Sequence, residues 1–218
     1  MKGKLLGLYD RLRAEYGFLD WWPGETKAEV MVGAILTQNT SWTNAQKAIA
    51  NLKRAKLLNL EKLSGAKLGR LEGLIRPSGF YRQKALRLKQ IFMYIRKKHL
   101  TLHRFLSRDK VSLRNELLLL NGIGKETADS IVLYAAQKST FVIDAYTKRI
   151  TSRLYGTSER IGYDELQNSI QSEIPEDVGL YKDFHAQFVE HAKKYCRKKP
   201  LCPQCPLNRI CAYAANAK

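Results

Sequence analysis

The sequence predicts an all-α fold with about nine or ten helices. Helical periodicity dominates the chain, turns containing Gly and Pro separate the periodic segments, and residues 139–144 form the one strand-like run. A single short run has no partner strand with which to form a sheet. With 218 residues and 44% hydrophobic content, the chain suits one large domain or two small lobes that share a core.

Two long segments carry the clearest helical pattern. Apolar residues follow one face of residues 84–98 and one face of residues 181–196. Helical spacing also covers residues 28–37, 43–55, 66–75, 111–119, 126–137, 145–155 and 163–173. Turn residues interrupt the pattern at 23–24, 77–79, 121–122 and 156, which places connections between helices there.

The chain is strongly basic. It has 38 Lys and Arg residues against 20 Asp and Glu residues, a net charge of +18, and a pI of about 9.8. This balance indicates a polyanionic partner, and nucleic acid is favoured over an acidic membrane surface. The sequence shows neither a long apolar run nor a signal-peptide pattern at its N-terminus. We therefore expect a soluble, cytoplasmic, nucleoid-associated protein, assuming a prokaryotic source.

Residues 111–137 have the pattern of a helix, a tight turn and a second helix. Gly122 and Gly124 can adopt positive φ and lack a Cβ, so the backbone can approach another molecule closely. Their amides and that of Lys125 would then point at a phosphate oxygen from the positive end of the second helix. The alternative is that Gly122 only ends the first helix as a C-cap. Lys125 and the net charge favour a contact with the DNA backbone.

Asp144 follows the apolar extended segment 139–143 and directly precedes a predicted helix. An Asp at this position is expected to act as an N-cap. The helix dipole and the nearby amides also favour its ionised form, so the cap leaves a carboxylate that can take part in chemistry. Both roles are compatible with this position.

All four cysteines lie near the C-terminus, with the spacing Cys-x5-Cys-x2-Cys-x5-Cys. This clustering in a chain without signs of secretion indicates a metal site rather than disulfides. Four thiolates can hold a 4Fe–4S cluster or a tetrahedral zinc ion, and the spacing alone does not decide between them. The predicted ligands are Cys196, Cys202, Cys205 and Cys211.

Several motifs resemble the endonuclease III superfamily of helix-hairpin-helix DNA glycosylases. The hairpin "LNGIGKETADSIVLYA", the aspartate motif "VIDAY", the segments "VGAILTQNTSWTNAQKAIANL" and "RPSGFYRQKALRLKQI" and the four cysteines carry this resemblance from about Trp21 to Cys211. It implies two helical lobes with a cleft that admits the damaged nucleotide. The expected lobes are a six-helix barrel over 25–137, with the hairpin at 111–137, and a second lobe built from 1–24 and 138–218.

The resemblance implies that Asp144 is the catalytic residue. In family members that also cut the DNA strand, a lysine at the position of Glu126 forms a Schiff base with the sugar, and a carboxylate cannot do so. We therefore expect a monofunctional glycosylase without AP-lyase activity, in which Asp144 stabilises the oxocarbenium-like sugar and orients or deprotonates the attacking water. Lys125 would point away from the pocket, because one residue turns a helix by about 100°.

The nearest branch by resemblance is 3-methyladenine DNA glycosylase III, which implies a substrate such as 3-methyladenine. A cationic alkylated purine is a good leaving group, and electron-rich aromatic rings suit its recognition. The implied base pocket consists of Trp22, Pro23, Trp42 and Glu126. The alternative is that the tryptophans only pack in the core or between lobes, and that Glu126 is only a first-turn acid.

The resemblance also implies that Gln38 and Phe80 fill the gap in the duplex that the flipped nucleotide leaves. Phe80 as an ordinary core residue is the alternative. The resemblance favours a structural 4Fe–4S cluster over zinc, although five residues separate the first two cysteines here and the usual family loop has six. His185 and His191 are expected to be packing or surface residues.

The predicted partner is double-stranded DNA containing damaged bases, bound by a monomer without a membrane. Two other functions stay open. One is an endonuclease III-like glycosylase for oxidised pyrimidines or mismatched thymine, and the other is a non-catalytic DNA-binding protein.

Overall fold

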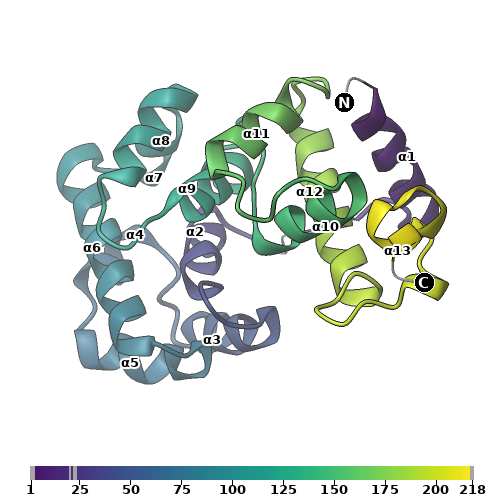
Figure 1. Ribbon diagram of the computed structural model, residues 1–218. Helices are drawn as coiled ribbons and strands as arrows, with labels where there is room; N and C mark the ends of the chain where they lie inside the picture. Colours follow the sequence, from purple (N-terminus) through teal and green to yellow (C-terminus); the bar gives the residue numbers. More distant parts are fainter. Residues whose placement is uncertain (1–2, 20, 22–23, 217–218) are drawn as a thin grey trace. The chain divides into compact units, whose positions relative to one another are not determined.

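A computed structural model of the protein describes residues 3–19, 21 and 24–216, and these residues form two compact units. Unit 1 combines the N-terminal segment up to Trp21 with Ser139–Lys218, and unit 2 is the continuous segment Trp22–Lys138. The described residues form α-helices and short 3-10 and π turns without a β-strand, so the predicted all-α class is confirmed (Figure 1). None of the described helices combines the length and apolar character needed to cross a membrane.

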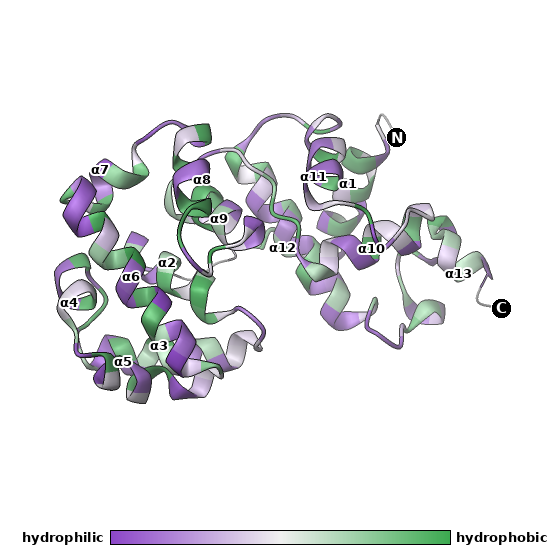
Figure 2. Ribbon diagram, turned by 60° about the vertical axis from the view of Figure 1, so that its left-hand side comes forward, coloured by the Kyte–Doolittle hydropathy of each residue, from purple (hydrophilic) through white to green (hydrophobic). Residues whose placement is uncertain are grey.

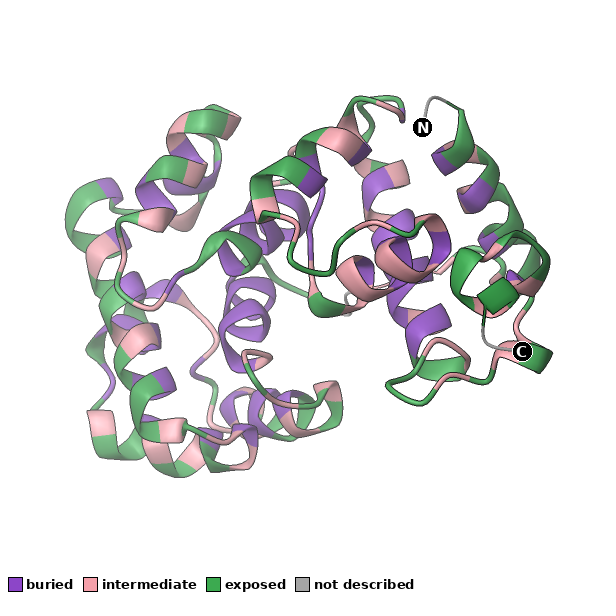
Figure 3. Ribbon diagram, viewed as in Figure 1, coloured by how far each residue is buried: buried purple, intermediate pink, exposed green. Residues whose placement is uncertain are grey.

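Unit 1 contains α1 (Lys4–Tyr16), α10 (Ala145–Tyr155), α11 (Tyr163–Gln171), α12 (Val178–Lys194) and α13 (Ala212–Asn216). The helix α12 is buried along most of its length and packs against α1 and α10 (Figure 3). An aromatic cluster fills this core: the Phe184 and Phe188 rings stack at 4.7 Å, and the ring of Phe141 meets both edge-on. The first and last parts of the chain therefore share one hydrophobic core.

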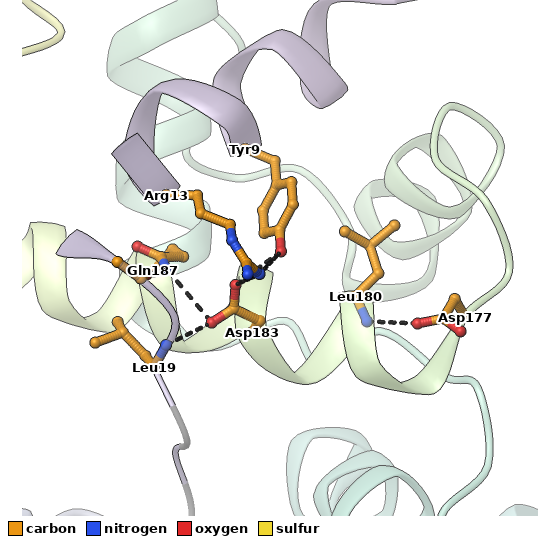
Figure 4. A network of polar contacts seen from close by, with 8 residues as sticks. Tyr9, Arg13, Leu19, Asp177, Leu180, Asp183 and Gln187 are labelled. Carbon is orange, nitrogen blue, oxygen red and sulfur yellow. Dashed lines mark hydrogen bonds and ion pairs between the residues drawn. The ribbon is translucent and has the colours of Figure 1, made fainter. Parts of the chain in front are cut away.

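A buried carboxylate joins α1 to α12 (Figure 4). Asp183 is 1% exposed, and its oxygens accept hydrogen bonds from Tyr9 Oη at 2.7 Å, Arg13 Nη1 at 3.1 Å and the Leu19 amide at 2.9 Å. A buried carboxylate requires such partners because it has lost its hydration. Gln187, one turn further along α12, donates to the backbone at the end of α1. These bonds fix the path of the chain after α1.

Unit 2 contains α2 (Lys27–Leu36), α3 (Trp42–Arg54), α4 (Leu60–Gly65), α5 (Leu68–Ile75), α6 (Tyr81–His99), α7 (Leu102–Leu106), α8 (Lys110–Leu118) and α9 (Lys125–Ser130). A π-helical turn at Ile131–Ala135 continues α9. Every residue of α2 after Lys27 is buried, and this helix packs against α3, α6 and the π-helical turn. The other long helices carry hydrophilic and hydrophobic residues on different faces (Figure 2). The α2 helix is therefore the centre of the unit 2 core.

Side-chain caps start many of the helices at positions that the sequence marks with Ser, Thr, Asn or Asp. In each case the side-chain oxygen accepts a hydrogen bond from the backbone amide three residues further on. The capping residues are Thr26, Ser41, Asn59, Thr101, Asp109, Asp144 and Asp177.

The predicted number of helices is wrong, whereas the prediction that residues 139–144 form no sheet is confirmed. The described residues contain thirteen α-helices rather than nine or ten, because the sequence prediction does not include α1 or the short helices α4, α7 and α13. The last three have only five or six residues, too few to show helical periodicity. The strand-like run 139–144 forms no strand, as its isolation in the sequence predicts, and its backbone has other hydrogen-bond partners. The Phe141 amide donates to Gln171 Oε1 at 2.7 Å, and Gln167 Nε2 donates to the Phe141 carbonyl at 2.6 Å.

Candidate active site

Asp144 is the N-cap of α10 in unit 1. Its Oδ1 accepts hydrogen bonds from the Thr147 amide at 2.7 Å and from Thr147 Oγ1 at 2.9 Å. The side chain is 13% exposed, so it is not fully withdrawn from solvent. Burial raises the pKa of the Asp144 carboxyl, but His185 and the Thr147 donors outweigh this effect and the pKa lies below its ordinary value. Asp144 is therefore ionised at neutral pH.

His185 supports this carboxylate from α12. Its Nε2 lies 3.6 Å from Asp144 Oδ2, and the residue is 2% exposed. The ring of Trp21 is 5.3 Å from the His185 ring and tilted by 58°. Of the two expected places for His185, packing or surface, the structure shows packing in the interior. Its partner could not be predicted, because 41 positions separate it from Asp144.

The hairpin turn precedes α9 in unit 2. Of the two glycines that can adopt positive φ, Gly122 does so, with φ +79°, whereas Gly124 has φ −88° and ψ 176°. Gly124 is instead the N-cap of α9 and has no side chain to accept a bond from the first-turn amides. A Cβ on Gly122 would lie 2.1 Å from Arg87 Nε. Both the backbone conformation and the neighbouring Arg87 therefore require glycine at position 122.

Gln38 ties the turn after α2 to this hairpin. Its Nε2 donates to the Gly122 carbonyl at 3.1 Å and to Thr127 Oγ1 at 2.9 Å. Its Oε1 accepts a hydrogen bond from Arg87 Nη1 at 2.6 Å. In this arrangement both ends of the Gln38 amide are bonded within unit 2, so insertion of this side chain into DNA would require these bonds to break.

Phe80 lies between the 3-10 turn Arg76–Ser78 and α6. It is 63% exposed and has φ +45°, in the left-handed region that a bulky residue rarely adopts. The preceding Gly79 also has positive φ, at +66°. The alternative of an ordinary core residue is therefore wrong for Phe80, which projects from the surface of unit 2.

The other described pocket residues lie at the starts of two helices of unit 2. Glu126 is exposed in the first turn of α9, next to the exposed Lys125, and Trp42 is the half-buried first residue of α3. Trp22 and Pro23 lie outside the described residues. Asp144 and the four cysteines belong to unit 1, and the other described site residues belong to unit 2.

The four cysteines line one cavity in unit 1, together with residues of α10 and α12. All four are free thiols, and Cys205 Sγ lies 3.5 Å from His191 Nε2. Burial raises the pKa of the Cys205 thiol to about 11, so a positively charged centre is needed to make it a thiolate. Among the described residues, no three His, Cys, Asp or Glu groups converge on a position for a single metal ion. Four soft sulfur donors around one cavity fit an iron–sulfur cluster.

Arg153 on α10 holds the loop between the first two cysteines. Its Nη1 donates to the Arg197 carbonyl at 2.6 Å and to Cys196 Sγ at 3.4 Å, and its Nη2 donates to the Lys198 carbonyl at 3.1 Å. The basic side chains of Arg197, Lys198 and Lys199 are exposed. The shortened loop is therefore held closed, with its positive charges on the surface.

These features define a class of protein: an all-α scaffold with a helix-hairpin-helix turn, an ionised aspartate at a helix N-terminus and a strongly basic surface. The chain belongs to the HhH-GPD superfamily of base excision DNA repair proteins, whose family model matches residues 32–176. It is thus a DNA glycosylase of base excision repair, and DNA is its partner.

Individual relatives agree with this assignment. A protein of Methanocaldococcus jannaschii that is provisionally named a DNA repair glycosylase is 48% identical over 206 residues, which cover 94% of both chains. Endonuclease III of Thermotoga maritima is 30% identical, and the match covers 84% of this chain and 82% of the relative. The structure of Helicobacter pylori 3-methyladenine DNA glycosylase bound to 1,N6-ethenoadenine matches with a TM-score of 0.79 and 32% identity, covering 87% and 97% of the two chains.

Proposed function

We propose that this protein is a monofunctional DNA glycosylase that removes alkylated purines such as 3-methyladenine from duplex DNA. The observation that carries this proposal is the ionised Asp144 carboxylate, of which Oδ1 caps α10 while Oδ2 faces His185. The likeness to the Helicobacter pylori enzyme supports the substrate class.

The proposed reaction is hydrolysis of the N-glycosidic bond. As the bond between C1′ and the base nitrogen breaks, its electron pair leaves with the base, and the negative Asp144 stabilises the positive charge on the sugar. Water then attacks C1′ and gives up a proton, with Asp144 orienting or deprotonating it. The products are a free base and an intact abasic site. A purine that already carries a positive charge leaves as a neutral base, so it needs little further activation.

Strand cleavage by an amine at position 126 is not part of this mechanism. Glu126 has no amine with which to form an imine, and it is exposed at the start of α9. We assign it instead to the base pocket, together with Trp22, Pro23 and Trp42. The faces of the tryptophan rings suit a cationic flipped base.

In this proposal, the hairpin around Gly122, Gly124 and Lys125 binds the phosphate backbone of the DNA. Backbone amides at the start of a helix and an exposed lysine suit a phosphate group and carry no sequence information. Phe80 is the wedge that enters the base stack, because it is exposed and apolar. Gln38 lies beside the hairpin, because its side chain donates to the Gly122 carbonyl.

The four cysteines would hold a 4Fe–4S cluster, which supplies a rigid cross-link rather than redox chemistry in the reaction. Cys196 and Cys202 flank the basic loop 197–201, so their fixation also fixes the exposed charges of that loop. Arg153 already holds two carbonyls of the loop in place. Fixed positive charges near a binding surface favour phosphate contacts.

A release assay tests the proposal. Wild-type protein is incubated with a panel of duplexes that contain 3-methyladenine, 1,N6-ethenoadenine, oxidised pyrimidines or mismatched thymine, and free bases and cut strands are measured separately. Release of alkylated purines without strand cleavage, lost in Asp144→Asn, is expected. DNA binding with no base release from any duplex would overturn the proposal in favour of a non-catalytic binding protein.

A second candidate is an endonuclease III-like glycosylase with strand cleavage, favoured by the 30% identity to the Thermotoga maritima enzyme. Borohydride reduction separates the two candidates, because it traps an imine between the protein and the sugar. Trapped wild-type adduct together with release of oxidised pyrimidines would establish the second candidate.

A further inference from the structure

Lys84 is a buried ammonium group near the start of α6. The residue is 1% exposed, and its Nζ donates hydrogen bonds to the Leu36 carbonyl at 2.9 Å and to the Ser78 carbonyl at 2.7 Å. Burial lowers the pKa of the Lys84 amine to about 8, and the nearby Arg87 charge acts in the same direction. A cation in the interior is costly compared with an apolar side chain of similar size. Packing alone therefore does not explain a lysine at this position.

The two carbonyls belong to the ends of two different segments. Leu36 is the last residue of α2 and precedes the turn that carries Gln38. Ser78 is the last residue of the 3-10 turn that precedes Phe80. One ammonium group thus joins two turns that are more than 40 positions apart in the sequence.

Lys84 also contacts the Phe80 turn through its backbone. The Lys84 amide donates to the Phe80 carbonyl at 3.0 Å, in the first turn of α6, while Nζ holds the Ser78 carbonyl on the other side of Phe80. Phe80 and Gly79 between these bonds both have positive φ. A bulky residue in that conformation persists only where its surroundings impose it, and Lys84 supplies bonds on both sides.

We propose that Lys84 is a positioning residue that holds the Phe80 turn against the end of α2, so that the exposed phenyl ring is already oriented for insertion into the DNA base stack. The inference rests on the role proposed above for Phe80. A ring held in place loses less conformational entropy on insertion than a ring on a mobile turn. Loss of Lys84 should therefore weaken base opening only because the Phe80 ring is no longer held in its orientation.

The matched control is Lys89 on the same helix. Its Nζ also donates to a backbone carbonyl, that of Ala66, at 2.9 Å, but Ala66 lies in neither of the two turns. Lys89→Met thus removes an ammonium group and one such bond from α6 and leaves both turns untouched.

The experiment is a double-mutant cycle on base opening. Full-length wild type, Phe80→Ala, Lys84→Met, the double variant and Lys89→Met are each bound to a duplex that carries 2-aminopurine beside a tetrahydrofuran abasic-site analogue. The rise in 2-aminopurine fluorescence on saturation reports the opened fraction. Circular dichroism and thermal unfolding check that each variant is folded, and Lys84→Gln, which keeps one donor group, replaces Lys84→Met in the cycle if the latter does not fold.

Phe80→Ala and Lys84→Met are each expected to lower the opening equilibrium on the order of tenfold, and the double variant is expected to resemble Phe80→Ala alone. Lys89→Met should open DNA like the wild type. Independent, multiplicative losses in the double variant, or unchanged opening in a folded Lys84 variant, would overturn the positioning role. If Phe80→Ala opens DNA like the wild type, the wedge role of Phe80 fails first and the role of Lys84 fails with it.

Discussion

Asp144 Oδ2 lies 3.6 Å from His185 Nε2, and this contact joins the N-terminus of α10 to the buried middle of α12. The Thr147 amide therefore holds Oδ1 of the Asp144 carboxylate, and the His185 imidazole lies against Oδ2. The arrangement fixes both the direction and the charge of the side chain. It also allows the structural and chemical roles of Asp144 to be tested apart.

Asp144→Asn should remove excision but keep the helix cap. The Asn side-chain oxygen can still accept the Thr147 amide, so the free energy of unfolding should change by less than about 1 kcal/mol. Loss of the negative charge should lower the single-turnover rate of 3-methyladenine release by about 10²- to 10⁴-fold. Asp177→Asn, which changes the exposed cap of α12 in the same way, is the control and should keep full activity. Normal excision by Asp144→Asn would exclude a catalytic Asp144.

His185→Leu should shift the acidic side of the pH–rate profile. In the wild type His185 and Thr147 keep the Asp144 pKa below its ordinary value, so its carboxylate stays ionised and the rate is maintained well into the acidic range. Without the imidazole, burial dominates and the pKa rises, so activity should be lost at a higher pH as the solution is acidified. Phe188→Leu, which removes buried volume from the same helix, should not shift the profile. An unchanged acidic limb in His185→Leu would mean that the contact has no electrostatic effect.

Glu126→Lys should introduce an amine that borohydride can trap on DNA. The wild type should give no covalent adduct, because an exposed carboxylate occupies this position. The adduct should persist in the double variant Lys125→Ala, Glu126→Lys, which shows that the new amine is responsible. The readout is a protein–DNA band that survives denaturing electrophoresis. Adduct formation by the wild type would contradict the monofunctional mechanism.

Iron analysis should identify the group held by the cysteines. Protein purified without oxygen is expected to contain about four iron and four acid-labile sulfide atoms per chain. Cys205→Ser should lose iron and visible absorption and unfold at a lower temperature, whereas Lys199→Ala in the adjacent loop should retain both. Stoichiometric zinc in place of iron would show that the cluster assignment is wrong.

The two hairpin glycines should differ in their effect on stability. Gly122→Ala places a Cβ at positive φ, which costs about 1–2 kcal/mol, and also displaces Arg87. Gly124→Ala should leave the free energy of unfolding nearly unchanged, because Gly124 has negative φ and no atom lies within 4 Å of the added Cβ. Urea unfolding measures both values. Equal losses in the two variants would contradict the assigned backbone geometry.

The fold class followed from the sequence because long amphipathic helices and turn residues are local signals. The helices expected at 43–55, 145–155 and 163–173 correspond to α3, α10 and α11, with boundaries that agree within two residues. The helix α1 is not among the predicted helices, although Leu5, Leu8 and Leu12 have helical spacing. The short helices and the hydrogen-bond partners of residues 139–144 depend on tertiary contacts, which local sequence patterns do not contain.

The candidate site was predictable only where one residue type carries the signal. The cap at Asp144 and the positive φ of Gly122 are of this kind, and both are present in the structure. The roles of the predicted site residues in DNA binding and catalysis stay predictions. Contacts such as Lys84 with Leu36 and Ser78 join distant segments, and a lysine in a basic amphipathic helix gives no sign that it is buried.

Unit 1 has a consequence for folding during synthesis. On the ribosome α1 is made first, but Asp183, which binds Tyr9 and Arg13, follows Arg13 by 170 positions. Unit 2 is continuous and complete before that residue is made, so it can fold while the chain still grows. The apolar face of α1 stays without its partner α12 until almost the whole chain has been made. Chaperones that shield nascent hydrophobic segments would bind there.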